Sequence, residues 1–292
     1  MKRLILTISA CLVVLFASSQ LLPESSLRVS YIYEYNTTGP YSGKSEHHKD
    51  DFLLLTSPQY SYFYGVTTHH LDSIYSNPKS RSEYIALRRQ LAQASPKSSF
   101  DSDGKLINFP GDEQLGLPIK GSQIQVIKDI ANNSVTVYDA LGDKKYRYHI
   151  PIQNIDWEIE DSTKNILGFD CILATAIYCG RKWNAWFCQD IPIFDGPWQL
   201  RGLPGIILLA ESDDFDHTFI ATGVEAVKQI IAPPPIPLNK DVVEINRNEF
   251  LKMKYNFILN PTRSLKERGF SPLNPIGQDN LVKHDFLEID YK

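Results

Sequence analysis

The amino-acid sequence predicts a β-rich α+β fold with an antiparallel sheet, and three observations predict it. The segment LRVSYIYEYNTT, which begins at Leu27, alternates apolar and polar residues with period two, as a strand with one buried face does. Similar short segments recur along the chain and are separated by Asn-Asn, Gly-Asp and Pro turn signals. Helical spacing of apolar residues occurs in one segment between strands and in another after a proline-rich stretch.

The first strand is followed by a predicted hairpin and then by one inserted helix. In DFLLLTSPQYSYFYGV, the expected hairpin tip is formed by Ser57, Pro58 and Gln59. In RSEYIALRRQLAQAS, Ser82 is placed to cap a helix whose apolar residues recur at helical spacing. Four further short strands are expected in GSQIQVIKDI, SVTVYDAL, KYRYHIPI and IDWEIED.

The last part of the chain is expected to leave the sheet. Prolines in the connection 232–238 remove backbone donors and force an extended course. Beyond them, NRNEFLKMKYNFILNP carries apolar residues on one face and ends before Pro261, and a short helical segment continues to Gly269. We therefore expect a C-terminal helical arm over residues 246–269 that packs on the sheet.

A second hairpin is predicted with Cys179 and Gly180 as its two central residues, because Gly supplies the positive φ that such a turn needs. Counted outward from this turn, Cys171 falls opposite Cys188 at a non-hydrogen-bonded position, where Cα atoms approach to about 4.5 Å. This separation permits a disulfide, so we expect a Cys171–Cys188 bridge with Cys179 left as a thiol. The alternative is three buried thiols that act as small apolar side chains.

The segment GPWQLRGLPGIILLAESDD, residues 196–214, sets proline and glycine around an apolar run. Its GLPG motif predicts a corner of the sheet, because Pro cannot donate a ladder bond and Gly adopts conformations closed to other residues. The corner residues are Gly202, Leu203, Pro204 and Gly205. The IILLAES run that follows predicts a strand buried on both faces, and WQLR is expected to be a short strand between two turns. A phosphate cradle would need a helix after the motif, and a nucleic-acid loop would need cations within it and helices on both sides. The sequence therefore favours the corner over both alternatives.

The first twenty residues, MKRLILTISACLVVLFASSQ, have the pattern of a secretory signal peptide: two cations, a short apolar run and small residues. We expect a signal peptide over 1–19 and a single domain over 20–292. The alternative is lipidation at Cys11, against which the continuation of the apolar run past that residue argues. No later stretch is long and apolar enough for a membrane helix. The expected protein is therefore exported, periplasmic or extracellular, and without a transmembrane segment.

Charge excludes one class of partner. The chain carries 30 Lys and Arg against 34 Asp and Glu, a formal net charge of −4, and the loss of two cations, Lys2 and Arg3, with the signal peptide leaves −6. No run of five or more basic residues occurs in the sequence. Nucleic acid is therefore not an expected partner.

Three stretches carry a resemblance to a known family: LGFDC, GRKWNAWFCQDIPIFDGPWQLRGLPGIIL and LNPIG. With them the chain resembles the GLPGLI family, exported proteins of Bacteroidetes named after the corner motif, and weaker similarity runs from about Ser30 to Ile276. Departures are Ile206 and Ile207, where the family usually has Leu-Ile, and the lack of an acidic residue after Ile276. The resemblance implies export and a shared fold, and it implies no reaction. It also implies a strongly curved antiparallel sheet, a half-barrel that encloses a helix, by analogy with periplasmic lipoprotein-carrier folds.

Two adjacent histidine pairs are candidate metal ligands: His47 with His48, and His69 with His70. Neighbouring residues on a strand point to opposite faces, so each pair supplies one ligand unless it lies in a loop. A site would need both pairs together with a carboxylate such as Asp72 or Asp51. The alternative is that these are solvated loop histidines.

An acidic tip, ESDDFDH, follows the buried strand at residues 211–217. Carboxylate pairs perform acid–base chemistry or bind calcium, but the Gly and distal Glu of a calcium loop are missing here. A charged hairpin tip is therefore the expected structure. A nucleophilic Cys179, with Arg181 and Lys182 beside it, would also need a local histidine that the sequence does not supply.

Aromatic side chains concentrate around the second hairpin and the corner. A concave apolar face lined by such rings could bind a lipid, an acyl chain or a hydrophobic peptide, with two arginines at its edge meeting an anionic group. The expected ligand-binding residues are Tyr178, Arg181, Trp183, Trp186, Phe187, Trp198 and Arg201. The alternative is that these rings fill the core of the curved sheet.

We therefore expect a non-enzymatic exported protein that binds an apolar ligand or an envelope protein partner and needs no cofactor. The alternative is an envelope hydrolase or metal-dependent enzyme that uses the histidine pairs or the acidic tip at 211–217. Metal analysis of native protein separates the two, because a stoichiometric transition metal lost on substitution of His47 or His69 would favour the enzyme.

Overall fold

Strands dominate the part of the chain that the computed structural model describes, which comprises residues 23–38, 45–100, 106–108, 110–142, 144–238, 240–259 and 286–290. The expected signal peptide at 1–19, the LNPIG stretch and the part of the helical arm beyond Leu259 lie outside these described residues. None of the helices in the described ranges has the length and apolar character that a membrane crossing requires.

Twelve of the strands in the described residues form one mixed but mainly antiparallel sheet. Their bounds are β1 Glu24–Thr38, β2 Ser45–Thr56, β3 Tyr60–Gly65, β6 Gln125–Asp129, β7 Ser134–Leu141, β8 Lys144–Pro151, β9 Glu158–Ile166, β10 Phe169–Tyr178, β11 Arg181–Cys188, β12 Ile206–Ser212, β13 His217–Ile230 and β14 Val242–Glu244. Their order is β14-β8-β7-β6-β3-β2-β1-β13-β12-β11-β10-β9, so the sheet is open and not a closed barrel. Among the described strands of this sheet, only β14 and β8 pair in parallel. A separate small sheet pairs β4 (Ser99–Phe100) with β5 (Leu106–Asn108).

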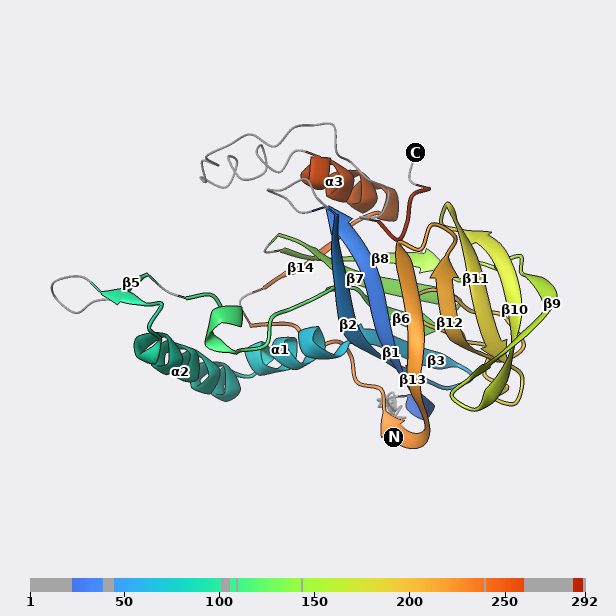
Figure 1. The fold of residues 1–292 in the computed structure, drawn as a ribbon, viewed down its shortest axis with the longest axis horizontal. Coiled ribbons are helices and arrows are strands. Elements are labelled where there is room, and N and C mark those ends of the chain that lie inside the picture. The colour runs from blue at the N-terminus through green and yellow to red at the C-terminus, as the bar shows by residue number, and fades with distance from the viewer. Residues whose placement is uncertain are drawn as a thin grey trace, which may run out of the picture.

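The sheet bends around one apolar core. In Figure 1, β1, β2 and β13 lie in front of β7 and β8, and β9 to β12 continue the sheet to one side. Alternate residues of β1 are buried, as the period-two pattern predicts, and the ring of Tyr33 stacks on that of Phe219 from β13 with centroids 4.4 Å apart. The same core cluster holds Val137 of β7 and Trp183 of β11, so strands from both ends of the sheet share its concave face.

Helices cover or extend from the sheet at two places. After β3 come α1 (Val66–Ser76) and α2 (Pro78–Ala94), and α2 extends away from the sheet (Figure 1). A single 3₁₀ turn forms at Glu113–Leu115. The described part of the predicted helical arm is α3 (Arg247–Leu259), which lies across one end of the sheet (Figure 1).

The prediction of one inserted helix capped by Ser82 is wrong. Two helices are present, and Asn77 caps the second: its side-chain oxygen accepts hydrogen bonds from the backbone N–H groups of Lys79 and Ser80, at 3.0 and 3.1 Å. Pro78 then occupies the first helical turn, where its missing N–H has no consequence. Ser82 is already inside the helix, where its hydroxyl donates to the carbonyl of Pro78.

The 189–205 connection between β11 and β12 fills the concave face. The WQLR part of it was predicted as a strand, and this is wrong: the N–H of Leu200 donates to the carbonyl of Pro197 in a turn, and Trp198 has a positive φ of 51°. The connection is tied to the sheet through a buried ion pair, in which Nζ of Lys128 lies 2.5 Å from the Asp195 carboxylate. That carboxylate also accepts from the hydroxyl of Thr56 at 2.7 Å.

This ion pair is neutral as a unit, and both of its side chains are buried. Burial lowers the pKa of Lys128, although Asp195 opposes the shift. Burial raises the pKa of Asp195, but Lys128 and its hydrogen bonds outweigh burial and hold that pKa below its usual value. If the connection moved away, each partner would become a buried charge without compensation. The pair therefore fixes where the connection crosses the sheet.

The GLPG motif forms the predicted corner, directly before β12. The N–H of Gly205 donates to the carbonyl of Leu203 at 2.8 Å, and Gly202 has a φ of 95°. A Cβ at Gly205 would overlap the carbonyl oxygen of Cys188 and lie 2.6 Å from its carbonyl carbon. The need for glycine at 205 is therefore mainly the close approach of two backbones. The IILLAES strand is buried on both faces, as predicted.

The second hairpin has the predicted register. Cys179 and Gly180 occupy its turn with φ values of 51° and 82°, and Cys171 pairs with Cys188. The three described cysteines, Cys171, Cys179 and Cys188, are buried free thiols in this structure. The partners of the expected disulfide therefore face each other unbonded, and the bridge stays a prediction for oxidised protein.

Candidate binding site at the end of the concave face

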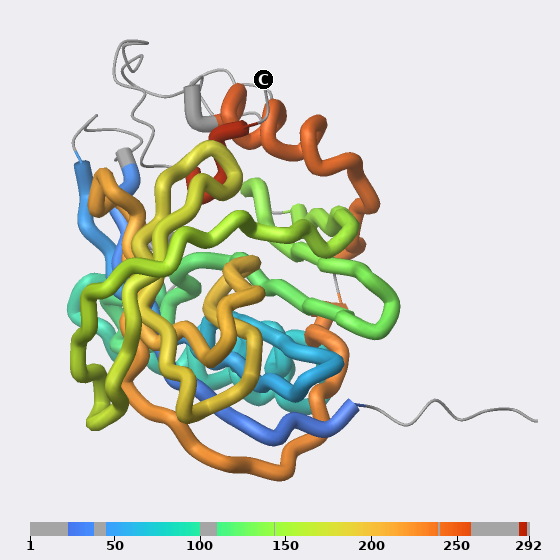
Figure 2. Tube along the Cα trace, turned by 90° about the vertical axis from the view of Figure 1, so that its right-hand side faces the viewer, coloured from blue at the N-terminus to red at the C-terminus, as the bar shows by residue number. Residues whose placement is uncertain are grey.

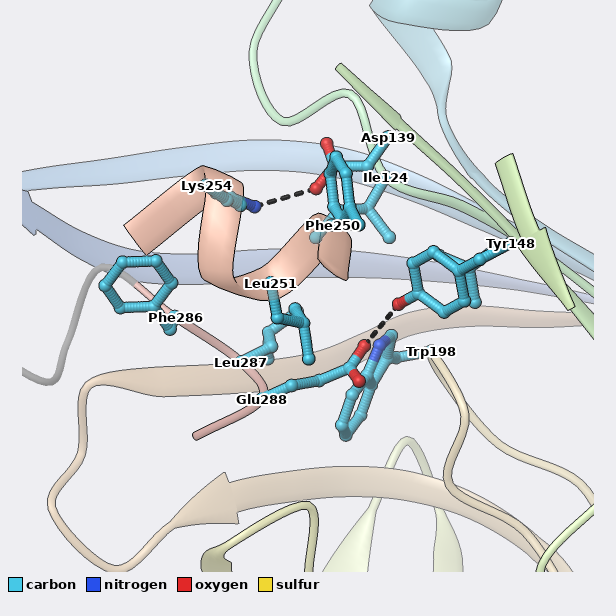
Figure 3. A pocket seen from close by; sticks show the side chains of 11 residues that line it. Ile124, Asp139, Tyr148, Trp198, Phe250, Leu251, Lys254, Phe286, Leu287 and Glu288 are labelled. Carbon is cyan, nitrogen blue, oxygen red and sulfur yellow. Dashed lines mark hydrogen bonds and ion pairs between the residues drawn. The ribbon is translucent and has the colours of Figure 1, made fainter. Parts of the chain in front are cut away.

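A pocket opens where α3 and the 286–290 segment lie across the concave face. Its empty volume is about 320 Å³, solvent at its mouth included. Its lining is Ile124, Val137, Asp139, Tyr148, Trp198, Phe250, Leu251, Lys254, Phe286, Leu287 and Glu288. Figure 3 shows Tyr148 directed at Glu288 beside Trp198, and Lys254 directed at Asp139, to which its ammonium bonds at 2.7 Å.

Glu288 is the centre of a buried polar network beside this pocket. Its Oε1 accepts hydrogen bonds from the hydroxyl of Tyr148 at 2.6 Å and from Nε2 of Gln199 at 2.9 Å. Its Oε2 pairs with Nε of Arg247 at 2.5 Å. The three donors come from β8, the 189–205 connection and α3. The carboxylate therefore joins three elements that are remote in the sequence.

The backbone carbonyl of Phe286 is held by two buried side chains. Arg181 donates to it from Nε and Nη2, and Nε2 of His217 lies 3.1 Å from the same oxygen. A carbonyl can only accept, so Nε2 of His217 carries the proton and Nδ1 accepts from the hydroxyl of Tyr33 at 2.9 Å. Burial and the nearby Arg181 charge lower the pKa of His217 to about 3, so its imidazole is neutral at ordinary pH.

The turn of the second hairpin completes the site. The N–H of Ile289 donates to the carbonyl of Cys179 at 2.9 Å, and a Cβ at Gly180 would lie 2.8 Å from the Ile289 side chain. Gly180 therefore permits both the turn and the close approach of the segment. Figure 2 shows the 286–290 segment in red beside the hairpin tip in yellow and α3 in orange.

Cys179, Glu288 and Asp290 offer ligand atoms within 4.8 Å of one another and are the one such cluster of three or more in the described residues. Arg247 lies among them: it pairs with both carboxylates at 2.5 Å, and its Nη2 is 3.7 Å from the Cys179 sulfur. Burial raises the pKa of the Cys179 thiol, whereas a metal ligand must be a thiolate. The guanidinium therefore already supplies the positive charge that these groups need, and the arrangement fits an ion-pair network.

The residues predicted to line an apolar ligand site are placed mostly in the core. Trp183, Trp198 and Phe187 are fully buried, and the two tryptophan rings pack together with centroids 5.6 Å apart. Tyr178 is also buried and donates its hydroxyl to Gln199. This arrangement corresponds to the alternative in which the rings fill the core of the curved sheet.

The three other predicted ligand residues do not share one face. Trp186 is half-buried, and the ammonium of Lys164 lies over its ring. Trp183, three positions earlier on the same strand, faces the core. Arg181, expected at an exposed edge, is buried and bonded to Asp214 as well as to Phe286. Arg201 is half-buried, and its carbonyl accepts from the Trp157 indole.

The histidine pairs lie on different elements. His47 and His48 are on β2, where His48 bonds to the hydroxyl of Thr37. His69 and His70 are on α1, where the ring of His69 packs on Tyr64 and burial lowers the pKa of His69. No potential metal cluster among the described residues includes either pair.

Asp72, one of the carboxylates proposed to join them, is a buried residue of α1 and is already paired. It binds the ammonium groups of Lys120 and Lys145, and the latter lies 2.9 Å away. Two cations therefore satisfy the carboxylate without a metal ion.

The acidic 211–217 segment forms the tip between β12 and β13, as predicted. Asp214 accepts from the hydroxyl of Ser212 at 2.5 Å and pairs with Arg181 at 2.5 Å. These bonds, with burial opposing them, lower the pKa of Asp214. The tip therefore helps to hold Arg181 in place.

The sequence did not predict four polar residues of the site: Tyr148, Gln199, Arg247 and Glu288. Tyr148 lies in a predicted strand, Gln199 in the WQLR segment and Arg247 in the predicted helical arm. No helix or strand was predicted for the segment that contains Glu288. Their convergence depends on the fold alone.

Comparison with known proteins gives three findings. A family model described as a protein of unknown function (Porph_ging) matches residues 179–209, which run from the second hairpin turn through the corner into β12. That range overlaps the long stretch behind the GLPGLI resemblance, although the match does not supply that family name. No curated protein matches the chain.

Two solved structures of PNGF-II are similar to the described fold. The structure in space group C2 has a TM-score of 0.48 and 10% identity, over 80% of this chain and 33% of that chain. The structure in space group P21 has a TM-score of 0.47 and 11% identity, over 79% and 33%. This chain therefore matches about a third of the length of PNGF-II.

Proposed function

We propose that this chain is an exported, non-enzymatic binding protein that docks an envelope protein by taking an extended segment of that partner at the end of its concave face. The observation that carries the proposal is the convergence of Arg181, His217 and Arg247 on one short chain segment. Buried donors held by separate rigid elements are suited to recognise a peptide carbonyl and carboxylates. Export rests on the pattern of residues 1–19.

A purely apolar ligand is less compatible with this site. The aromatic rings that could line a lipid pocket are packed against one another. The pocket beside α3 is lined by Asp139, Lys254 and Glu288 as well as by apolar groups. An acyl chain would remove the remaining water from the Lys254–Asp139 ion pair and offer it no hydrogen bond in return. The analogy with lipoprotein carriers therefore extends to the curved sheet and not to the ligand.

The pKa values of His217 and Cys179 do not favour the alternative of a hydrolase. A general base at neutral pH works best with a pKa near 7, whereas the pKa of His217 is about 3. A cysteine nucleophile needs a lowered pKa, whereas burial raises that of Cys179. His217 and the backbone of Cys179 instead form hydrogen bonds that stabilise the fold.

Native mass spectrometry of the full chain, purified from its own envelope, tests the proposal. The expected result is a co-purifying polypeptide of defined mass that is lost in Arg247→Gln. It is retained in Arg147→Gln, a matched control in which an arginine paired with Glu244 lies outside the site. A co-purifying lipid that organic extraction removes, or a polypeptide that both variants retain equally, would contradict the proposal.

A further inference from the structure

We infer that the 286–290 segment is a resident ligand that occupies the docking site in the unbound protein, and that the partner segment which replaces it has the same chemistry. That chemistry is two apolar residues, a glutamate, an apolar residue and an aspartate. The inference rests on the proposed function and names the ligand class of the same site.

The segment is bound as a peptide ligand would be, and not as a strand of the sheet. It has no regular secondary structure, and its backbone is held through the Phe286 carbonyl and the Ile289 N–H. The groups that meet these two atoms are side chains of β11 and β13 and a carbonyl of the hairpin turn. The contacts are therefore specific, yet the sheet hydrogen bonds do not depend on them.

Charge complementarity defines two positions of the ligand. Arg247 pairs with Glu288 through Nε and with Asp290 through Nη2, each at 2.5 Å. Glu288 is buried, so an apolar or basic side chain at its position would leave Gln199 and Tyr148 without this acceptor. It would also remove the charge that pairs with Nε of Arg247. The site therefore selects an acidic residue there.

Apolar burial defines the other positions. Phe286 and Leu287 are buried, at 3% and 7% exposure, and both line the pocket beside Leu251. Ile289 packs where Gly180 lacks a side chain. A ligand with polar residues at the first two positions would lose this burial.

Tethering gives the resident segment an advantage over a free peptide. A segment joined to its own site competes at an effective concentration in the millimolar range. A free peptide of the same sequence should therefore bind the wild-type chain weakly. Loss of the Glu288 carboxylate from the resident segment should open the site without changing the residues that form it.

The experiment titrates a fluorescent peptide of residues 284–292 into the full-length chain and follows its anisotropy. The expected result is at least tenfold tighter binding to full-length Glu288→Ala than to wild type, and no binding of the same peptide carrying Glu288→Ala. A second full-length variant, Asp290→Asn, alters the exposed end of the segment and should give an intermediate gain. It keeps the test informative if Glu288→Ala does not fold.

Equal, weak binding to wild type and to folded Glu288→Ala or Asp290→Asn would overturn the inference. An envelope partner that binds wild type and Glu288→Ala equally, at a site sensitive to Arg247→Gln, would overturn the inference and leave the proposed function standing. Peptide binding as expected, without any envelope partner, would support the resident-ligand part of the inference and contradict the proposed function.

Discussion

Arg181 donates two hydrogen bonds to the backbone carbonyl of Phe286, from Nε at 2.9 Å and from Nη2 at 2.6 Å, across 105 positions of sequence. Arg181 follows the Cys-Gly turn of the second hairpin, within the stretch that the family model matches. The same guanidinium holds Asp214 at the tip of the next hairpin. Arg181 therefore joins the second hairpin, the acidic tip and the 286–290 segment.

Replacement of Arg181 by Met should lower the free energy of unfolding by about 3 kcal/mol, because a buried carbonyl and the Asp214 carboxylate lose their charged donor. Urea denaturation measures the change. The control is Lys182→Met, an exposed cation on the same strand, whose effect should stay within about 0.5 kcal/mol. Equal losses in the two variants would contradict the role assigned to Arg181.

Stability should fall as the pH drops below about 6.5, partly through His217. The folded protein keeps this imidazole neutral down to its pKa of about 3, whereas the unfolded chain binds a proton below its ordinary value of 6.5. Each pH unit in this window removes up to about 1.4 kcal/mol of stability. Denaturation curves between pH 7 and 4 should show a shallower loss for His217→Gln than for wild type. The exposed control His149→Gln should follow wild type, and identical slopes for all three proteins would exclude the assignment.

The two glycines of the corner should differ in their tolerance of a side chain. Gly205→Ala places a Cβ against the Cys188 backbone, so we expect a loss above about 3 kcal/mol or failure to fold. Gly202→Ala meets open space and carries only the strain of a φ of 95°, so the expected loss is about 1–2 kcal/mol. Thermal unfolding of both variants measures the difference, and the reverse order would show that the backbone approach at Gly205 is unimportant.

Oxidation should join Cys171 to Cys188 and leave Cys179 reduced. The first two pair across the hairpin, but burial and the neighbouring Cys188 raise the pKa of Cys171 to about 12. Because exchange requires a thiolate, folded reduced protein should form the bridge slowly near neutral pH, and refolding under oxidising conditions should form it readily. Peptide mapping of refolded protein checks this. A bridge that contains Cys179 would contradict the pairing.

Local turn chemistry made part of this fold predictable. The two-residue turn at Cys179 and Gly180 sets the hairpin register by itself, so the Cys171–Cys188 pairing follows by counting. The strand in IILLAES and the corner before it also follow from residues that are adjacent in the sequence.

Features that depend on distant contacts were not predictable. The WQLR segment reads as a strand, but it is a buried turn in which Trp198 takes a positive φ that bulky residues rarely adopt. Arg181 looked like an edge residue because its acceptor on Phe286 lies far along the chain. Glu288 and Arg247 meet only after the 286–290 segment and α3 reach the same end of the sheet.

Amide hydrogen exchange of Ile289 in the full-length chain tests the central claim, that the 286–290 segment is a ligand that leaves its site while the sheet stays folded. The Ile289 N–H donates to the Cys179 carbonyl, so it exchanges when the segment detaches. The account predicts exchange at least about a hundredfold faster than at Ala185, a fully buried residue of β11, because local opening needs less free energy than global unfolding. Equal protection of the two amides would show that the segment is an integral part of the fold.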